Sequence, residues 1–228
     1  MNQLEYRHEY KHAINLLDYH TLRQRIRCVA RLDPNAGTDG RYHIRSLYFD
    51  NEDDKALREK LYGLPSREKF RIRLYNENGD FIRLEKKSKN NGLCNKQSTK
   101  LTRAQAEQII TGDTAWMLTA NNALLAEFYA KICYQRLRPK TLVDYFREAY
   151  IFPYGNVRIT FDSDVRTGLY STELFDKDVP TLRTGEPGVL LLEVKYDNFL
   201  PDIIRDLIQT NTRRTESFSK YAVCRIYG

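Results

Sequence analysis

The sequence is poor in cysteine, with four residues among 228 and no Cys-x-x-Cys pair. This spacing argues against a zinc cluster and against a disulfide framework, so we expect four reduced thiols. The sequence also lacks any apolar run approaching the roughly 20 residues of a membrane helix. Its first residues lack the basic-then-apolar pattern of a secretory signal. These absences predict a soluble, cytoplasmic protein with no membrane segment of its own.

A large charge excess of one sign is also missing. The chain has 37 basic and 30 acidic residues, a net charge of +7 and 41% apolar residues. The positive balance indicates an anionic partner, while the interleaving of both signs argues against a nonspecific nucleic-acid binder. The apolar content is ordinary for a globular protein, and neither a repeat nor a linker divides the chain. We therefore expect a single domain over residues 1–228.

The charge is concentrated on one face of a predicted hairpin over residues 69–89. Phe70, Ile72 and Leu74 alternate with Arg71 and Arg73, and strand side chains point to opposite faces with period two. The next segment repeats this alternation, with apolar Ile82 and Leu84 opposite the charged residues Arg83, Glu85, Lys87 and Lys89. Gly79, in the polar stretch at residues 76–80, marks the turn.

One such charged face would simply be solvated in most antiparallel sheets. The same device recurs, however, with a cation beside a carboxylate, in the segments Arg7-His-Glu9-Tyr-Lys11, Arg158-Ile-Thr-Phe-Asp162 and Glu193-Val-Lys195. If these strands close into a barrel with their charged faces inward, the interior is a cationic tunnel with isolated carboxylates. A tunnel of this kind suits a polyanion and a divalent metal.

The remaining elements are assigned from periodicity and from capping or turn residues. The other strands are expected at 5–12, 41–50, 141–151, 156–165 and 189–196. Helices are expected at 18–30, with Asp18 as the cap, at about 52–61, at 102–111 and 121–135 in a helical insert covering about 102–136, and at 201–209. A mobile loop is expected at 90–100, and weak strand structure within 167–188.

Taken in order, these motifs resemble the VTC domain, the polyphosphate polymerase domain of the triphosphate tunnel metalloenzyme (CYTH-like) superfamily. The motifs are Glu9-x-Lys11, Arg71-x-Arg73, Arg83-x-Glu85-x-Lys87, Tyr145-x-Arg147, Arg158-Ile-x-x-Asp162, Glu193-Val-Lys195 and Phe218-Ser-Lys220-Tyr221. The resemblance spans nearly the whole chain. It implies an α+β fold with a closed eight-stranded antiparallel tunnel flanked by helices.

The resemblance also implies roles for individual residues. Those matching positions that hold the triphosphate or the growing polyphosphate, and taken as catalytic, are Lys11, Arg71, Arg73, Lys87, Arg147, Arg158 and Lys220. Further contacts to substrate are expected from Lys89, Arg83 and Lys195. Glu193 matches the carboxylate that binds Mn²⁺ or Mg²⁺, while Glu9 and Glu85 are placed on the tunnel face without a role.

One departure from the superfamily bears on the reaction. Hydrolytic tunnel enzymes typically begin with Glu-x-Glu-x-Lys, whereas this chain has Arg7-x-Glu9-x-Lys11. The resemblance therefore favours metal-dependent polyphosphate synthesis from ATP over its alternatives, a triphosphatase or a non-catalytic polyphosphate- or nucleotide-binding module. Because most aromatic residues alternate with apolar ones, a stacking platform for nucleic acid is poorly supported. The eukaryotic polymerase of this family sits in a membrane complex, so a membrane-protein partner is possible for this chain. The sequence does not determine the oligomeric state.

Overall fold

An antiparallel sheet dominates the computed structural model, which describes residues 6–76, 78–209 and 217–227. Eight strands follow one another in the order β1-β10-β8-β7-β3-β4-β5-β6. Their bounds are β1 His8–Ile14, β3 Tyr42–Asp50, β4 Ser66–Tyr75, β5 Asn78–Asn90, β6 Leu93–Leu101, β7 Arg138–Phe152, β8 Val157–Thr167 and β10 Leu190–Tyr196. Two short strands, β2 (Arg31–Leu32) and β9 (Leu182–Arg183), pair with β7 and β8.

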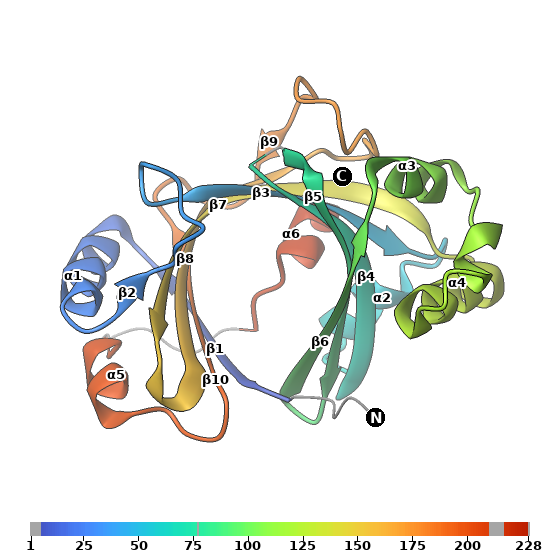
Figure 1. Cartoon of the computed structure of the whole chain (residues 1–228). Coiled ribbons are helices and arrows are strands. Elements are labelled where there is room, and N and C mark those ends of the chain that lie inside the picture. Colours follow the sequence, from blue (N-terminus) through green and yellow to red (C-terminus); the bar gives the residue numbers. More distant parts are fainter. Residues whose placement is uncertain (1–5, 77, 210–216, 228) are drawn as a thin grey trace.

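The eight strands curl into a ring, seen end-on in Figure 1. The edge strands β1 and β6 meet at a bridge between Arg7 and Cys94, whose backbone N–H groups donate to each other's carbonyls at 2.9 and 3.1 Å. The predicted α+β fold with an eight-stranded antiparallel tunnel is thus confirmed, but the expected closure is not. The edge strands are joined by an isolated bridge and not by a continuous ladder of hydrogen bonds.

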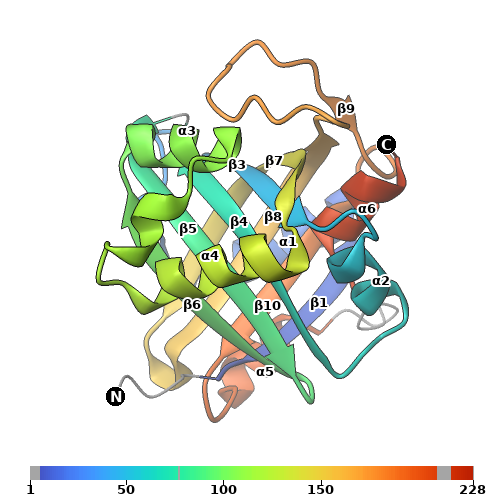
Figure 2. The ribbon, with the colours of Figure 1, turned by 90° about the vertical axis from the view of Figure 1, so that its right-hand side faces the viewer.

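The alternation along the strands separates an apolar outside from a charged inside. On one side of the ring, Phe70, Ile72 and Leu84 pack outward against α3 (Arg103–Thr111) and α4 (Ala123–Gln135), which lie over β4, β5 and β6 in Figure 2. On the other side, α1 (Leu16–Arg27) and α5 (Asp202–Leu207) cover Ile159 and Leu192. Because two apolar cores lie outside the ring, the polar faces of its strands are left to line the interior.

A further helix, α6 (Lys220–Ile226), lies across one end of the ring, beside α2 (Lys55–Leu61) (Figures 1 and 2). Its Tyr221 and Cys224 pack against inward-facing Tyr48 and Tyr145. Ser219 caps the helix by accepting the N–H of Ala222 at 3.3 Å. The sequence analysis assigned no element here. Seven residues with one hydrophobic face give too weak a periodic signal to predict a helix.

Two predictions about local structure were wrong. Residues 90–100 are not a loop but the end of β5, a tight turn and most of β6, which pairs with β5 from Asn90↔Leu93 to Ile82↔Leu101. Asn91 (φ 47°) and Gly92 (φ 89°) form the tight turn, and an Asn-Gly pair with two positive φ angles is the preferred two-residue hairpin connection. The first helix begins at Leu16 with Asn15 as its cap, and Asp18 instead closes the capping box.

The other elements lie close to their predicted positions, including α2 (Lys55–Leu61) and the two helices of the insert, between which η1 (Ala115–Leu118) forms a short turn. A second short turn, η2 (Tyr154–Asn156), precedes β8. Residue 77 of the predicted β4–β5 turn lies outside the described residues. Within the part of the chain that the structure describes, all helices are too short or too polar to cross a bilayer.

Candidate phosphate-binding tunnel

Two neighbouring strands supply a row of inward-facing cations. On β4 these are Arg67, Lys69, Arg71 and Arg73, and the register pairs them in turn with Lys89, Lys87, Glu85 and Arg83 of β5. Like charges directly opposite each other on a sheet are destabilising. The arrangement therefore costs stability unless carboxylates or a bound anion offset the repulsion.

Glu85 is the carboxylate at the centre of this row and is fully buried. It accepts hydrogen bonds from Arg71 Nε and Nη2 at 2.8 and 2.6 Å, and its other oxygen lies 3.2 Å from Lys96 Nζ. Arg73 Nη1 lies 3.6 Å from the same carboxylate. Burial favours the neutral acid, but Arg73, Arg71 and Lys96 hold the pKa of Glu85 well below its ordinary value.

Glu9 and Glu193 form a second group with lysines of β1, β5 and β10. Glu9 contacts Lys87 and Lys11 at 2.6 and 2.7 Å, and Lys195 Nζ lies 2.5 Å from Glu193 and 3.7 Å from Glu9. Burial lowers the pKa of Lys195 to about 8 despite Glu193. Burial disfavours ionisation of both glutamates, yet the surrounding lysines keep their pKa values low. Glu9, Glu193 and Lys87 are therefore charged at neutral pH, because the pKa of Lys87 is raised, and Lys195 loses its proton more easily than Lys87.

Asp162 anchors a third group deeper in the ring. It accepts a bidentate pair of hydrogen bonds from Arg147 at 2.6 and 2.7 Å, and Lys220 Nζ of α6 lies 2.5 Å from it. The Lys220 ammonium also stands 4.6 Å from the centre of the Tyr145 ring. Asp162 thus ties α6, at the end of the ring, to the sheet and pairs with two cations.

The ammonium of half-buried Lys69 lies 5.4 Å from the ring centre of buried Tyr48, and both side chains have a lowered pKa. Burial, with help from Lys87 and Lys11, lowers the pKa of Lys69 to about 7. Burial opposes ionisation of Tyr48, but Arg71, which donates to its hydroxyl at 2.6 Å, and Lys69 lower the pKa of that phenol to about 7. Both groups can therefore change charge near neutral pH.

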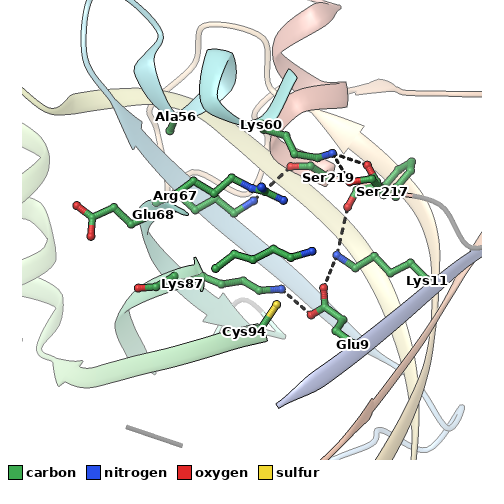
Figure 3. A pocket seen from close by; sticks show the side chains of 14 residues that line it. Glu9, Lys11, Ala56, Lys60, Arg67, Glu68, Lys87, Cys94, Ser217 and Ser219 are labelled. Carbon is green, nitrogen blue, oxygen red and sulfur yellow. Dashed lines mark hydrogen bonds and ion pairs between the residues drawn. The ribbon is translucent and has the colours of Figure 1, made fainter. Parts of the chain in front are cut away.

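A cavity of about 650 Å³, including its open mouth, lies at the end of the ring where β4 begins and β5 ends (Figure 3). Six cations line it, together with the Glu9 carboxylate: Lys11, Lys60, Arg67, Lys69, Lys87 and Lys89. Glu68 also borders the cavity, but its carboxylate points away from it and pairs with Lys86 and Lys131. In Figure 3 the ammonium groups of Lys11 and Lys87 point into this space. Positive charge therefore continues from the interior of the ring to its mouth.

Most of the predicted site residues are brought together by this arrangement, but two are not. Arg158 faces inward near the opposite end of the ring, where it is ion-paired to Asp33 and donates to the Tyr42 hydroxyl at 2.9 Å. Arg83 lies over the Phe81 ring at 4.8 Å and is separate from the cavity lining. The sequence analysis missed Lys60, Arg67 and Lys69. The last two continue the period-two face of Arg71 and could have been found from it, whereas Lys60 lies on α2 and gave no such signal.

In the described part of the chain, the tunnel carboxylates could supply only one or two protein ligands to a metal ion. Among residues 6–76, 78–209 and 217–227, no group of three or more His, Cys, Asp or Glu side chains is placed to hold a metal ion. Glu9 and Glu193 nevertheless both lie near Lys195. A Mg²⁺ ion that keeps phosphate oxygens as ligands needs only one or two carboxylates. The residues therefore fit a divalent ion that is held jointly with a phosphate chain.

Comparison with solved structures places the ring in a known class. A protein from Hippeastrum, HpAC1, described as an adenylyl cyclase candidate with a dominant triphosphatase activity, matches at 12% identity over 97% of this chain and 96% of its own, with a TM-score of 0.57. The PH1012 protein of Pyrococcus horikoshii OT3 matches at 14% identity over 95% of this chain and 98% of its own, with a TM-score of 0.50. The fold is that of the triphosphate tunnel proteins.

The family follows from the sequence profile. The VTC domain profile matches residues 6–226, which is nearly the whole chain, and the chain belongs to that family. The resemblance inferred from the tunnel motifs is thereby confirmed. No curated protein matches the sequence.

Proposed function

We propose that the chain is a metal-dependent phosphotransferase that synthesises polyphosphate from ATP inside the cationic tunnel. The observation that carries the proposal is the continuous row of cations from Arg73 and Arg71, through Lys69 and Lys87, to Lys89 at the mouth. A row that extends beyond the interior of the ring suits a polyanion longer than one triphosphate. Membership of the VTC family supports the same reading.

Phosphoryl transfer depends mainly on positioning and on electrostatic stabilisation, because the transition state spreads negative charge over the equatorial phosphate oxygens. Arg71 and Arg147 already present their guanidinium groups in bidentate geometry to carboxylates. The same fork can grip phosphate oxygens. Lys11, Lys87 and Lys220 supply point charges that can follow a moving chain.

In the proposed step, an oxygen of the terminal phosphate of the acceptor forms a bond to the γ-phosphorus of ATP. The bond from that phosphorus to the β,γ-bridging oxygen breaks, and ADP leaves. A Mn²⁺ or Mg²⁺ ion held by Glu193, with Glu9 nearby, would neutralise part of the phosphate charge. The tunnel residues hold the two reacting ends in line and exclude water from the acceptor position.

The test is to incubate the purified chain with ATP, Mn²⁺ and a short polyphosphate primer and to resolve the products on a polyphosphate-stained gel. We expect a ladder of long chains together with ADP. Arg71→Ala should reduce the rate by at least about a hundredfold, as loss of a charged transition-state contact does. Arg103→Ala, at an exposed ion pair on α3, is the matched control and should leave the rate unchanged.

Two outcomes would reject the polymerase proposal. Release of ADP with free phosphate alone would mean that water is the acceptor, as in a triphosphatase; the activity described for HpAC1 gives this alternative its support. Binding of ATP with no release of ADP would indicate a binding module.

A further inference from the structure

Three lysines of the tunnel mouth donate hydrogen bonds to a short piece of the chain itself. This piece is Ser217–Ser219, called here the strap, which leads into α6. The contacts are Lys60 Nζ to the carbonyl and hydroxyl oxygens of Ser217 at 2.5 and 2.7 Å, Lys11 Nζ to the Phe218 carbonyl at 3.2 Å, and Lys69 Nζ to the Ser219 hydroxyl at 3.3 Å. Figure 3 shows Ser217 and Ser219 at the edge of the cavity, beside Lys60.

The three lysines come from separate elements, α2, β1 and β4, and converge on three successive residues. Convergence from different elements requires the fold to place them, because no local sequence motif could. Each ammonium donates to a neutral strap oxygen, in a cavity that six cations line, and Lys11 also contacts the Glu9 carboxylate at 2.7 Å. The strap therefore satisfies hydrogen bonds of the lysines but offsets none of their charge.

Phosphate oxygens would satisfy both. They accept the same charge-assisted hydrogen bonds from an ammonium group, and each phosphate adds the negative charge that a carbonyl or hydroxyl oxygen lacks. The four strap oxygens also stand at the mouth, where the row formed by Lys69, Arg71 and Arg73 on β4 ends. A chain of phosphates that follows this row outward arrives at the positions that the strap oxygens occupy.

We propose that Lys60 and Lys69, together with Lys11, form a further phosphate-binding subsite at the tunnel mouth. In the free chain the strap oxygens fill this subsite, and an inorganic oligophosphate replaces them. The inference rests on the proposed function, since it requires that the tunnel bind phosphate chains. It adds two binding residues and a competition between ligand and strap.

Hydrogen–deuterium exchange of the amides at 217–222 tests the replacement directly. Saturating tripolyphosphate or a longer polyphosphate should speed exchange in this segment, because the strap loses three of its anchors, while exchange in β4 and β5 slows. Binding that leaves 217–222 unchanged or more protected would overturn the subsite and keep the proposed function. Failure of either phosphate to bind would overturn both.

Calorimetric titration of tripolyphosphate into variants separates two contributions to its affinity: the lysine contacts and the competition with the strap. Lys60→Ala should weaken binding about fivefold, since it removes one charged phosphate contact. Lys55→Ala, on the same helix and paired with Glu59, is the matched control and should bind as the unaltered chain does.

Substitutions in the strap should act through competition. Ser217→Asp places a carboxylate against Lys60 and should weaken tripolyphosphate binding about fivefold, because an internal anion now fills the subsite. Ser217→Ala removes one strap acceptor and should leave binding unchanged or slightly tighter. If Lys60→Ala binds as tightly as Lys55→Ala, or Ser217→Asp binds as tightly as Ser217→Ala, the subsite is rejected.

Discussion

In the tunnel, many cations surround a few carboxylates, and each carboxylate offsets the repulsion among the cations that contact it. Glu85, Glu9, Glu193 and Asp162 each contact at least one Lys or Arg, and all four are buried or nearly so. Breaking a buried ion pair from one side leaves the other charge uncompensated. Single substitutions here should therefore affect stability as well as activity, and a phosphate chain should change the size of the effect.

Glu85→Gln tests this balance. It removes the charge that faces Arg71, Arg73 and Lys96 and should lower the free energy of unfolding by about 3 kcal/mol. Saturating tripolyphosphate should restore part of the loss, because phosphate supplies negative charge to the same arginines. Urea denaturation with and without tripolyphosphate measures both effects. Glu107→Gln, at an exposed pair on α3, should cost little, and an equal loss in the two variants would contradict the assignment.

The acidity of Lys69 and Tyr48 predicts a pH dependence of stability. An unfolded lysine keeps its proton to about pH 10, and an unfolded tyrosine does likewise. In the folded chain the pKa of each group is about 7. The unfolded state therefore binds more protons between pH 7 and about 10, so the free energy of unfolding should rise with pH across this range.

The rise attributable to Lys69 should be at most about 1.4 kcal/mol per pH unit. Chemical denaturation between pH 7 and 9 measures it, with Lys69→Met as the comparison. The variant should show a shallower slope and higher stability at pH 7, because it buries no ammonium group. A parallel slope in both proteins would show that Lys69 does not titrate there.

At the scale of elements, Asp50 joins three segments. At the end of β3 it accepts the backbone N–H groups of Ala56 and Leu57 in α2 at 2.9 and 3.2 Å, and the hydroxyl of Tyr221 in α6 at 2.7 Å. The carboxylate thus accepts N–H groups at the start of α2 and holds α6 at the end of the ring. Lys60 on α2 and Lys220 on α6 depend on this junction for their positions.

Asp50→Ala should therefore destabilise the fold by about 2–4 kcal/mol, since it leaves buried donors without an acceptor. Tyr221→Phe removes one of these hydrogen bonds and should cost about 1 kcal/mol. Thermal or urea unfolding ranks the two variants. A larger loss from Tyr221→Phe than from Asp50→Ala would contradict the described role of Asp50.

The whole molecule carries a net charge of +7, and much of it converges on one cavity. A ligand that binds only the folded state raises stability, by about 2.7 kcal/mol at a concentration 100 times its dissociation constant. A polyanion that relieves repulsion among the lysines should raise stability less at high salt than at low salt, because salt screens the attraction.

Melting temperature should rise in the order phosphate, tripolyphosphate, long-chain polyphosphate, each compared at equal phosphorus concentration. The rise should shrink between 50 mM and 500 mM NaCl. Differential scanning fluorimetry measures both trends, with a neutral polymer such as polyethylene glycol as the control. A rise that is insensitive to salt, or the same for phosphate and polyphosphate, would contradict an extended cationic site.

Much of the fold and of the tunnel lining could be predicted from the sequence, because period-two alternation is a local property of a strand. Phe70, Ile72 and Leu74 had to share one face and Arg71 and Arg73 the other, whatever the rest of the chain did. The order of the motifs then pointed to the VTC family. The strand β6 was missed although its Asn91-Gly92 turn was readable, because its polar composition was given more weight than its turn chemistry.

The sequence by itself determined the strands, the sign of their charged faces and the family. Only the tertiary structure decided which charges meet: Asp162 with both Arg147 and Lys220, Asp33 with Arg158, and Lys60, Lys11 and Lys69 with the strap. The physical reason is that alternation fixes the face of a side chain, whereas the curling of the sheet into a ring and the packing of α6 against its end fix the neighbours of that side chain. These two features of the tertiary structure depend on contacts between residues far apart in the chain.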